Sequence, residues 1–265
     1  MPDNSKPGFC RNCLDGIRVP LLALVVLGSI ICVLLLPPIA QPLSYHDFAD
    51  QRTLLGVPNG WNVLTNLAFI LAGVIGLAGM RAHASLPIVY PVFFAAIVLV
   101  GFGSGWYHLN PDNSTLVWDR LPMAIAFMAL FAIVIGEYID VRYGRWLWLP
   151  LVLLGMASVG YWHITELAGH GDLRPYGLVQ FLPLPLILLL VWLHPDKHHR
   201  GRYLLAAFLC IVVSRLTEWF DLPIYEATGF ISGHALKHLA AALAVWFIWL
   251  WIRTGIDTPR RESCY

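Results

Sequence analysis

Polar side chains that can bind a metal ion or transfer protons stand in three otherwise apolar segments. Ser104 and His108 are four residues apart, His234 and His238 are four residues apart, and Asp119 opens a further apolar stretch. Residues four apart share one face of a helix, so His234 and His238 would offer two imidazole nitrogens to one zinc ion. Three histidines with a carboxylate nearby suit a catalytic zinc ion, which keeps an open position for water.

The chain that carries these residues has the composition of a membrane protein. Of its 265 residues, 58% are hydrophobic and 12% are charged, whereas soluble domains carry about 25% charged residues. The same numbers exclude a disordered chain, and a net charge of +1 gives no basic surface for nucleic acid. Five scattered cysteines do not form a disulfide framework. The composition therefore predicts an integral membrane protein.

Eight apolar stretches are long enough to cross a bilayer, which takes about 20 residues per helix. The expected spans are Ile17–Leu36, Trp61–Met80, Ile88–Tyr107, Trp118–Tyr138, Trp146–Trp162, Gly177–Leu193, Arg202–Phe220 and Gly233–Ile252. Tryptophan and tyrosine stand near many of their ends, as residues at the membrane surface do. We predict an all-α, polytopic membrane helix bundle.

Positive charge orients this bundle, because Lys and Arg collect in cytoplasmic loops. With a cytoplasmic N-terminus, the outer loops hold only Arg52 and Arg174. The inner segments hold Lys6, Arg11, Arg18, Arg81, Arg142, Arg145, Lys197, Arg200, Arg202, Arg253, Arg260 and Arg261. We therefore expect both termini in the cytoplasm. The membrane we expect is a bacterial inner membrane.

This topology brings the candidate site residues to one membrane depth. The outward third helix would end at His108, and the inward fourth and eighth helices would begin near Asp119, His234 and His238. Each histidine alone is more simply explained as a helix-end residue hydrogen-bonded to a neighbour. Ionisable residues inside a membrane are costly and mark function, so the complete set favours a metal site.

The three motifs together resemble the alkaline ceramidase-like superfamily, which also contains the progestin and adiponectin receptors. Residues 59–67 resemble the opening of the first core helix in the ceramidase branch, and residues 119–123 resemble its Asp-x-Leu-Pro-Met motif. The resemblance covers residues 45–253 and implies a seven-helix core there. Residues 1–44 would then form a cytoplasmic N-terminus and an extra transmembrane helix, and residues 254–265 a cytoplasmic tail.

The resemblance implies that His108, His234 and His238 bind zinc, that Asp119 transfers protons and that Ser104 forms hydrogen bonds near the metal ion. The expected reaction is hydrolysis of the amide bond of ceramide or a related N-acyl lipid to a fatty acid and a free amine. The implied partner is thus a membrane lipid. Zinc suits this chemistry because it lowers the pKa of bound water to about 7 and polarises a carbonyl group.

One segment departs from the family. Animal ceramidases have an acid-rich segment, associated with calcium, before the first core helix; here residues 45–50 contain only Asp47 and Asp50, and Asn59 replaces an expected acid. Calcium takes six to eight oxygen ligands, so a tight calcium site is doubtful. We expect Asp47 and Asp50 to lie in a solvated outer loop.

Other charged residues of the apolar stretches are expected to pair, because unpaired charges there are costly. The predicted cluster is Arg215, Glu218, Asp221 and Lys237. Glu166 is expected to pair with Arg174 near the outer surface.

Two alternative functions remain open at this point. One is a receptor-like protein of the same fold, which binds a lipid and holds zinc for structure alone. The other is a b-type cytochrome, which ranks last because histidines four apart on one helix do not suit the two opposite axial positions of a haem.

Overall fold

The computed structural model describes residues 11–81, 83, 86–194 and 198–256. Of the predicted cytoplasmic cations, Lys6, Lys197, Arg260 and Arg261 lie outside these residues. Regular structure within the described part is helical, apart from an isolated bridge between Leu54 and Val57. The chain divides into two compact units, Met1–Pro37 and Pro38–Tyr265.

The first unit contains one helix, α1 (Arg11–Leu35). The predicted span Ile17–Leu36 falls on this helix. Its described apolar part, Pro20–Leu35, is shorter than the helices of the second unit that can cross a membrane.

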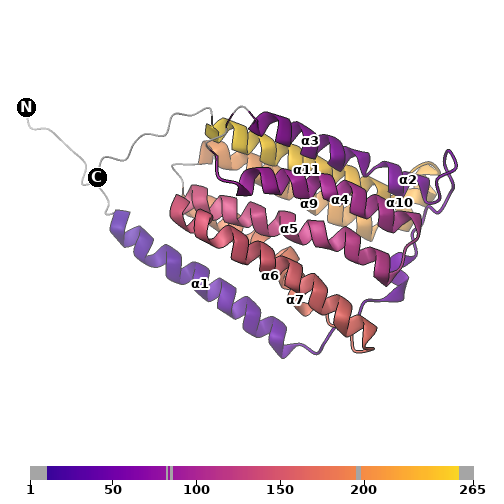
Figure 1. The fold of residues 1–265 in the computed structure, drawn as a ribbon, viewed down its shortest axis with the longest axis horizontal. Helices are drawn as coiled ribbons and strands as arrows, with labels where there is room; N and C mark the ends of the chain where they lie inside the picture. The colour runs from indigo at the N-terminus through magenta and orange to yellow at the C-terminus, as the bar shows by residue number, and fades with distance from the viewer. Residues whose placement is uncertain (1–10, 82, 84–85, 195–197, 257–265) are drawn as a thin grey trace, which may run out of the picture. The chain divides into compact units, whose positions relative to one another are not determined.

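The second unit is a bundle of helices that run alongside one another (Figure 1). Its elements are η1 (Leu43–His46), α2 (Gly60–Leu64), α3 (Leu67–Met80), α4 (Val89–Leu109), α5 (Asn113–Tyr138), α6 (Val141–Leu167), α7 (Arg174–Phe181), α8 (Pro183–Leu193), α9 (His198–Trp219), α10 (Asp221–Thr228) and α11 (Gly233–Ile256). Helices α3, α4, α5 and α6 pack in chain order, and α11 packs against both α3 and α9.

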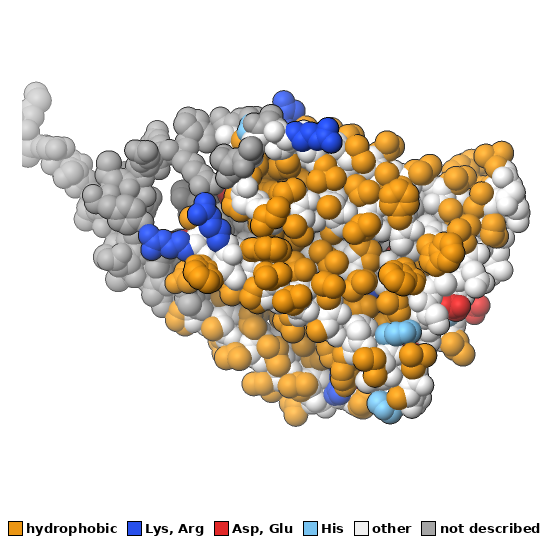
Figure 2. Space-filling view, in the orientation of Figure 1, with side chains coloured by type: hydrophobic (Ala, Val, Ile, Leu, Met, Phe, Trp, Pro, Cys, Tyr) orange, Lys and Arg blue, Asp and Glu red, His pale blue; other side chains and the backbone are white. Residues whose placement is uncertain are grey.

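Six helices or near-continuous helix pairs of this unit are long and apolar enough to cross a membrane. They are Gly60–Met80, Val89–Leu109, Asn113–Tyr138, Val141–Leu167, Arg174–Leu193 and Gly233–Ile256. Helices α9 and α10 make a seventh if they count as one span, with a bend of 77° between them. Hydrophobic side chains cover most of the helical surface in view (Figure 2). The chain is therefore a multi-pass integral membrane protein.

The turn between α4 and α5 sets where the candidate site lies. Asp112 caps α5: its carboxylate accepts the backbone N–H of Thr115 at 2.6 Å, and the Thr115 hydroxyl oxygen accepts the backbone N–H of Asp112 at 3.1 Å. The hydrogen bond from the Thr115 backbone holds the pKa of Asp112 below its usual value. Because the turn is short, the end of α4 and the start of α5 lie at the same end of the bundle.

Candidate metal centre and its cavity

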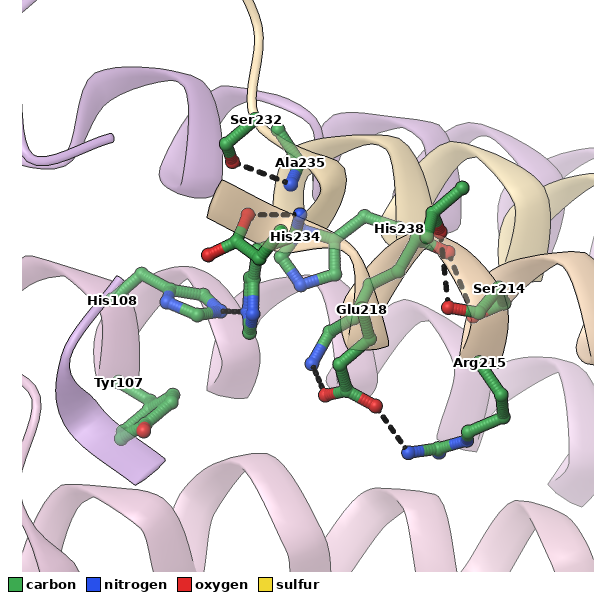
Figure 3. Close-up of polar contacts among 12 residues, drawn as sticks. Tyr107, His108, Ser214, Arg215, Glu218, Ser232, His234, Ala235 and His238 are labelled. Atoms are coloured by element: carbon green, nitrogen blue, oxygen red, sulfur yellow. Dashed lines mark hydrogen bonds and ion pairs between the residues drawn. The ribbon is translucent and has the colours of Figure 1, made fainter. Parts of the chain in front are cut away.

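Three histidines from two helices meet at one end of the bundle. His108 stands in the last turn of α4, and His234 and His238 stand in the first two turns of α11. All three are buried, and one ring nitrogen from each lies within 4.8 Å of the others. The Nε2 atoms of His108 and His234 face each other at 3.4 Å (Figure 3). The three residues are close enough to hold a metal ion.

Thr65 determines the tautomer of His238. The Thr65 hydroxyl donates its proton to the carbonyl of Trp61 at 2.7 Å, and its oxygen lies 2.9 Å from Nδ1 of His238. A hydroxyl group has a single proton, so Thr65 accepts the proton of Nδ1. That tautomer leaves Nε2 of His238 with the lone pair that a metal ion requires.

Asp221 and Gly233 fix the start of α11. The Asp221 carboxylate accepts the backbone N–H of His234 at 2.6 Å and that of Ala49 at 3.0 Å. An anion at this position suits the positive end of the helix dipole. A Cβ atom on Gly233 would lie 2.0 Å from the carbonyl oxygen of Thr217, so glycine is needed for α11 to approach α9 here. Both residues hold in place the first two turns of α11, which carry His234 and His238.

A strap, residues 45–52, covers two of the three histidines. The buried Phe48 ring packs against His108 and His234, with ring centroids 4.7 and 4.4 Å away. The bond from the Ala49 backbone to Asp221 ties the strap to the start of α11. The strap therefore places an apolar ring, rather than water, beside these imidazoles.

The prediction of a solvated loop is wrong for Asp50. Its side chain is 2% exposed, and its carboxylate accepts three hydrogen bonds from Arg52. Burial alone would raise the pKa of Asp50, but the bonds from Arg52 outweigh it and hold the pKa below its usual value. Arg52 also donates to the carbonyls of Gly229 and Phe230. The pair thus joins the strap to the segment before α11, whereas Asp47 is exposed.

Ser104 and Asp119 stand on the wall of a cavity next to the histidines. Both are buried, and both line this cavity together with His238. Ser104 on α4 and Asp119 on α5 thus face the same cavity. Asp119 is not one of the residues that can share a metal ion with the three histidines. Its carboxylate is thus placed beside the candidate metal centre.

Gly103 allows Ser104 and Asp119 to approach each other. A Cβ atom on Gly103 would lie 2.0 Å from the carbonyl oxygen of Trp118, at the contact between α4 and α5. The backbones of α4 and α5 therefore touch at Gly103 and Trp118, the residues directly before Ser104 and Asp119. Only glycine permits this approach.

The cavity has a volume of about 580 Å³ and lies among α4, α5, α7, α8, α9 and α11. Most of its lining is aliphatic or aromatic, with side chains such as Phe93, Met123 and Phe208. The charged side chains on its wall are Asp119, Arg120, Arg215 and Lys237. A cavity with a large apolar surface and a few clustered polar groups suits an amphiphilic ligand.

The predicted intramembrane charge cluster forms without Asp221. Glu218 accepts from Nη1 of Arg215 at 2.6 Å (Figure 3). It also accepts from Nζ of Lys237 at 2.5 Å. The pairing of these three residues is therefore confirmed. The inclusion of Asp221 is wrong, because its carboxylate is used by backbone N–H groups.

The predicted pair between Glu166 and Arg174 is also wrong. Arg174 forms its salt bridge with Asp172 at 2.8 Å, and its side-chain hydrogen bonds lower the pKa of Asp172 to about 2. Glu166 instead accepts from the indole N–H of Trp162 at 3.2 Å and the backbone N–H of Gln41 at 3.1 Å. Glu166 thus joins α6 to the segment before η1, and Asp172 joins the α6–α7 loop to the start of α7.

The structure brings together the three predicted histidines and puts Ser104 and Asp119 on the adjoining cavity wall, but the residues that support them were not predicted. Thr65 lies within the stretch 59–67 that carries the family resemblance, so this stretch was the available signal. Phe48 and Asp221 stand in segments with no motif, and their roles depend on how the strap and α10 fold over α11.

The fold and the site together define a class of protein: a multi-pass integral membrane protein with a buried three-histidine group beside an apolar cavity. No protein-family model matches the sequence, and no curated protein matches it. The resemblance to the alkaline ceramidase-like family therefore rests on the motif residues themselves.

Proposed function

We propose that the chain is a zinc-dependent amidohydrolase of the alkaline ceramidase-like family, which cleaves the amide bond of an N-acyl lipid inside the membrane. The observation that carries the proposal is the convergence of three buried histidines, within 4.8 Å of one another, beside the cavity that Ser104 and Asp119 line. The products would be a fatty acid and a free amine or sphingoid base.

Zinc is the ion that best fits the donor set. Three imidazoles and no thiolate are typical of catalytic zinc, and bonds of about 2.0–2.1 Å in tetrahedral geometry put two nitrogens about 3.4 Å apart. The Nε2 atoms of His108 and His234 are 3.4 Å apart, and Nδ1 of His238 is already engaged by Thr65. When bound, zinc would supply a water molecule of lowered pKa and polarise the amide carbonyl.

Asp119 and Ser104 are the proposed catalytic residues. Asp119 would accept a proton from the attacking water and return it to the leaving nitrogen, as a general base and then a general acid. Ser104 would donate a hydrogen bond to the oxygen on which negative charge develops. Their burial excludes bulk water, which strengthens both interactions. The apolar part of the cavity would hold the acyl chain.

The orientation we propose puts both termini in the cytoplasm and the metal centre toward the outer face, in a bacterial inner membrane. It is supported by Arg81 after α3, Arg142 in the first turn of α6 and Arg253 near the end of α11, all at helix ends opposite His108. Reporter fusions at the C-terminus and in the loop at residues 112–113 should give opposite answers. Identical answers would contradict the proposed topology.

The metal is tested by elemental analysis of the purified protein. We expect about one zinc per chain and no haem absorption, in line with a three-histidine catalytic site. The double variant His234→Ala and His238→Ala should lose the zinc, whereas the exposed His170→Ala should keep it. Zinc that is fully retained in the double variant would refute the site.

The reaction is tested by incubating the zinc-loaded protein with N-acyl lipids and detecting released fatty acid. Asp119→Asn should keep zinc but lose about 10²–10⁴-fold in turnover, the usual contribution of proton transfer, and Ser104→Ala should lose less. Asp140→Asn, at the opposite end of α5, is the matched control because Asp140 only caps α6 in this structure. Tight binding of one lipid without hydrolysis by the wild-type protein would favour the receptor-like alternative.

A further inference from the structure

Arg120 is a buried cation on the wall of the cavity that lacks a direct anionic partner. Its side chain is 6% exposed, and among the described residues it forms no salt bridge. Nη2 donates to the side-chain oxygen of Gln41 at 2.5 Å, whereas Nη1 has no hydrogen-bond partner. An unpaired donor on a buried charge is costly, so the site is incomplete without an acceptor.

Aromatic rings hold this guanidinium in place. Its Cζ atom lies 4.3 Å from the ring centroid of Trp162, 4.9 Å from that of Tyr176 and 5.6 Å from that of Tyr45. Such contacts stabilise a cation without using its hydrogen-bond donors. Nζ of Lys237 lies 6.0 Å from the centroid of the same Tyr45 ring, so two cations contact this ring.

The charges on the cavity wall are unequal. Arg120, Arg215 and Lys237 line the cavity, and among its described lining residues Asp119 is the one carboxylate. Glu218, which Arg215 and Lys237 share, does not line the cavity. The wall that faces a ligand is therefore cationic.

We propose that Arg120, assisted by Lys237, binds the carboxylate of a long-chain amphiphile in this cavity. The inference rests on the proposed function and narrows its substrates to amides whose head group carries a carboxylate, such as N-acyl amino acids. A guanidinium group forms strong charge-assisted hydrogen bonds with carboxylates. The apolar lining takes the acyl chain, so both parts of such a molecule find a matching surface.

Binding is tested with oleate and oleyl alcohol, which share one chain and differ in the charge of the head. Neither contains an amide, so the result does not depend on hydrolysis. Affinities are measured at equilibrium on the full-length protein in a neutral detergent, at a pH at which oleate is ionised. We expect oleate to bind about 10- to 100-fold more tightly than the alcohol, the usual effect of a hydrogen bond to a charged group.

Variants assign this preference to one side chain. Arg120→Gln should abolish the preference, and Arg120→Lys should keep part of it because the charge remains. Arg202→Gln is the matched control, because Arg202 also lies over a tyrosine ring, that of Tyr203 at 4.9 Å, but is exposed. Thermal unfolding identifies a variant that fails to fold. Oleate is also the acid that the proposed reaction releases, and its carboxylate could contact a metal ion at the histidines, so the comparison is made on metal-free protein, which should keep the preference.

The test is completed by hydrolysis of N-oleoylglycine and N-oleoylethanolamine, whose heads carry a carboxylate and a hydroxyl group, respectively. We expect N-oleoylglycine to be cleaved preferentially. Equal affinity of the wild type for oleate and the alcohol, or an unchanged preference in folded Arg120→Gln, overturns the inference even if both amides are cleaved. Equal cleavage of both amides overturns the proposed substrate class. A clear preference for oleate without cleavage of either amide supports the inference and counts against the proposed function.

Discussion

Replacement of Thr65 by valine tests whether a side chain outside the metal centre prepares it for zinc. Valine keeps the shape of threonine but has no oxygen, so Nδ1–H of His238 loses its hydrogen bond to the Thr65 hydroxyl. Thr65 is buried, and a buried donor without a partner costs about 1–3 kcal/mol. The proton of His238 is then free to move to Nε2, where it would block a metal bond.

The expected loss of zinc affinity is about 10- to 100-fold, as is usual when the partner of a metal-bound histidine is removed. This corresponds to about 1.4–2.7 kcal/mol, which agrees with the cost of the unpaired donor. Affinity is measured by competition with a coloured chelator in detergent.

Thr217→Val is the matched control for Thr65→Val. Both hydroxyls donate to a carbonyl in the preceding turn of their helix, Thr217 to that of Ser214, but only Thr65 also accepts from a candidate ligand. The control should therefore bind zinc as the wild type does. A folded Thr65→Val protein with wild-type zinc affinity would refute the tautomer argument.

Two further predictions concern stability. Gly103→Ala should destabilise the protein by about 1–3 kcal/mol, because the added Cβ would lie 2.0 Å from the Trp118 carbonyl oxygen. The control Gly105→Ala should not destabilise it, because its Cβ meets nothing within 4 Å. Equal melting temperatures of the two variants would contradict this prediction. Arg174 holds the pKa of Asp172 at about 2, below its unfolded value, so this stabilisation is complete above about pH 4 and is lost as the pH falls toward 2. Asp172→Asn should remove that part of the acid dependence of thermal unfolding, and an unchanged dependence would show that the pair contributes nothing.

Much of the helical framework could be predicted because a bilayer fixes the length of an apolar helix. The stretch Trp61–Met80 corresponds to α2 and α3, and Gly177–Leu193 to α7 and α8. Ends were less predictable: α6 begins at Val141, before the predicted Trp146, because Asp140 accepts the backbone N–H of Arg142 and caps the helix. The short α10 was missed because it carries no long apolar run.

The candidate ligands could be predicted because helical spacing and helix direction together fix where a side chain lies. His234 and His238 share a face, and the direction of α4 puts His108 at the same end of the bundle. The partners of charged residues could not be predicted in this way. Asp50 turns back to Arg52, and Thr65 meets His238 across 173 residues, because these contacts depend on the path of the strap and on how α11 packs.

The order of the three histidines along the chain has a consequence for biosynthesis. A nascent chain inserted into the membrane as far as α9 holds His108 alone, because His234 and His238 arrive with α11. At that stage Glu218 can already pair with Arg215 on its own helix, but its second partner, Lys237, belongs to α11 and is still absent. Completion of the three-histidine group and of the buried ion pairs are therefore late events, and the membrane insertion of α11 is the step on which both depend.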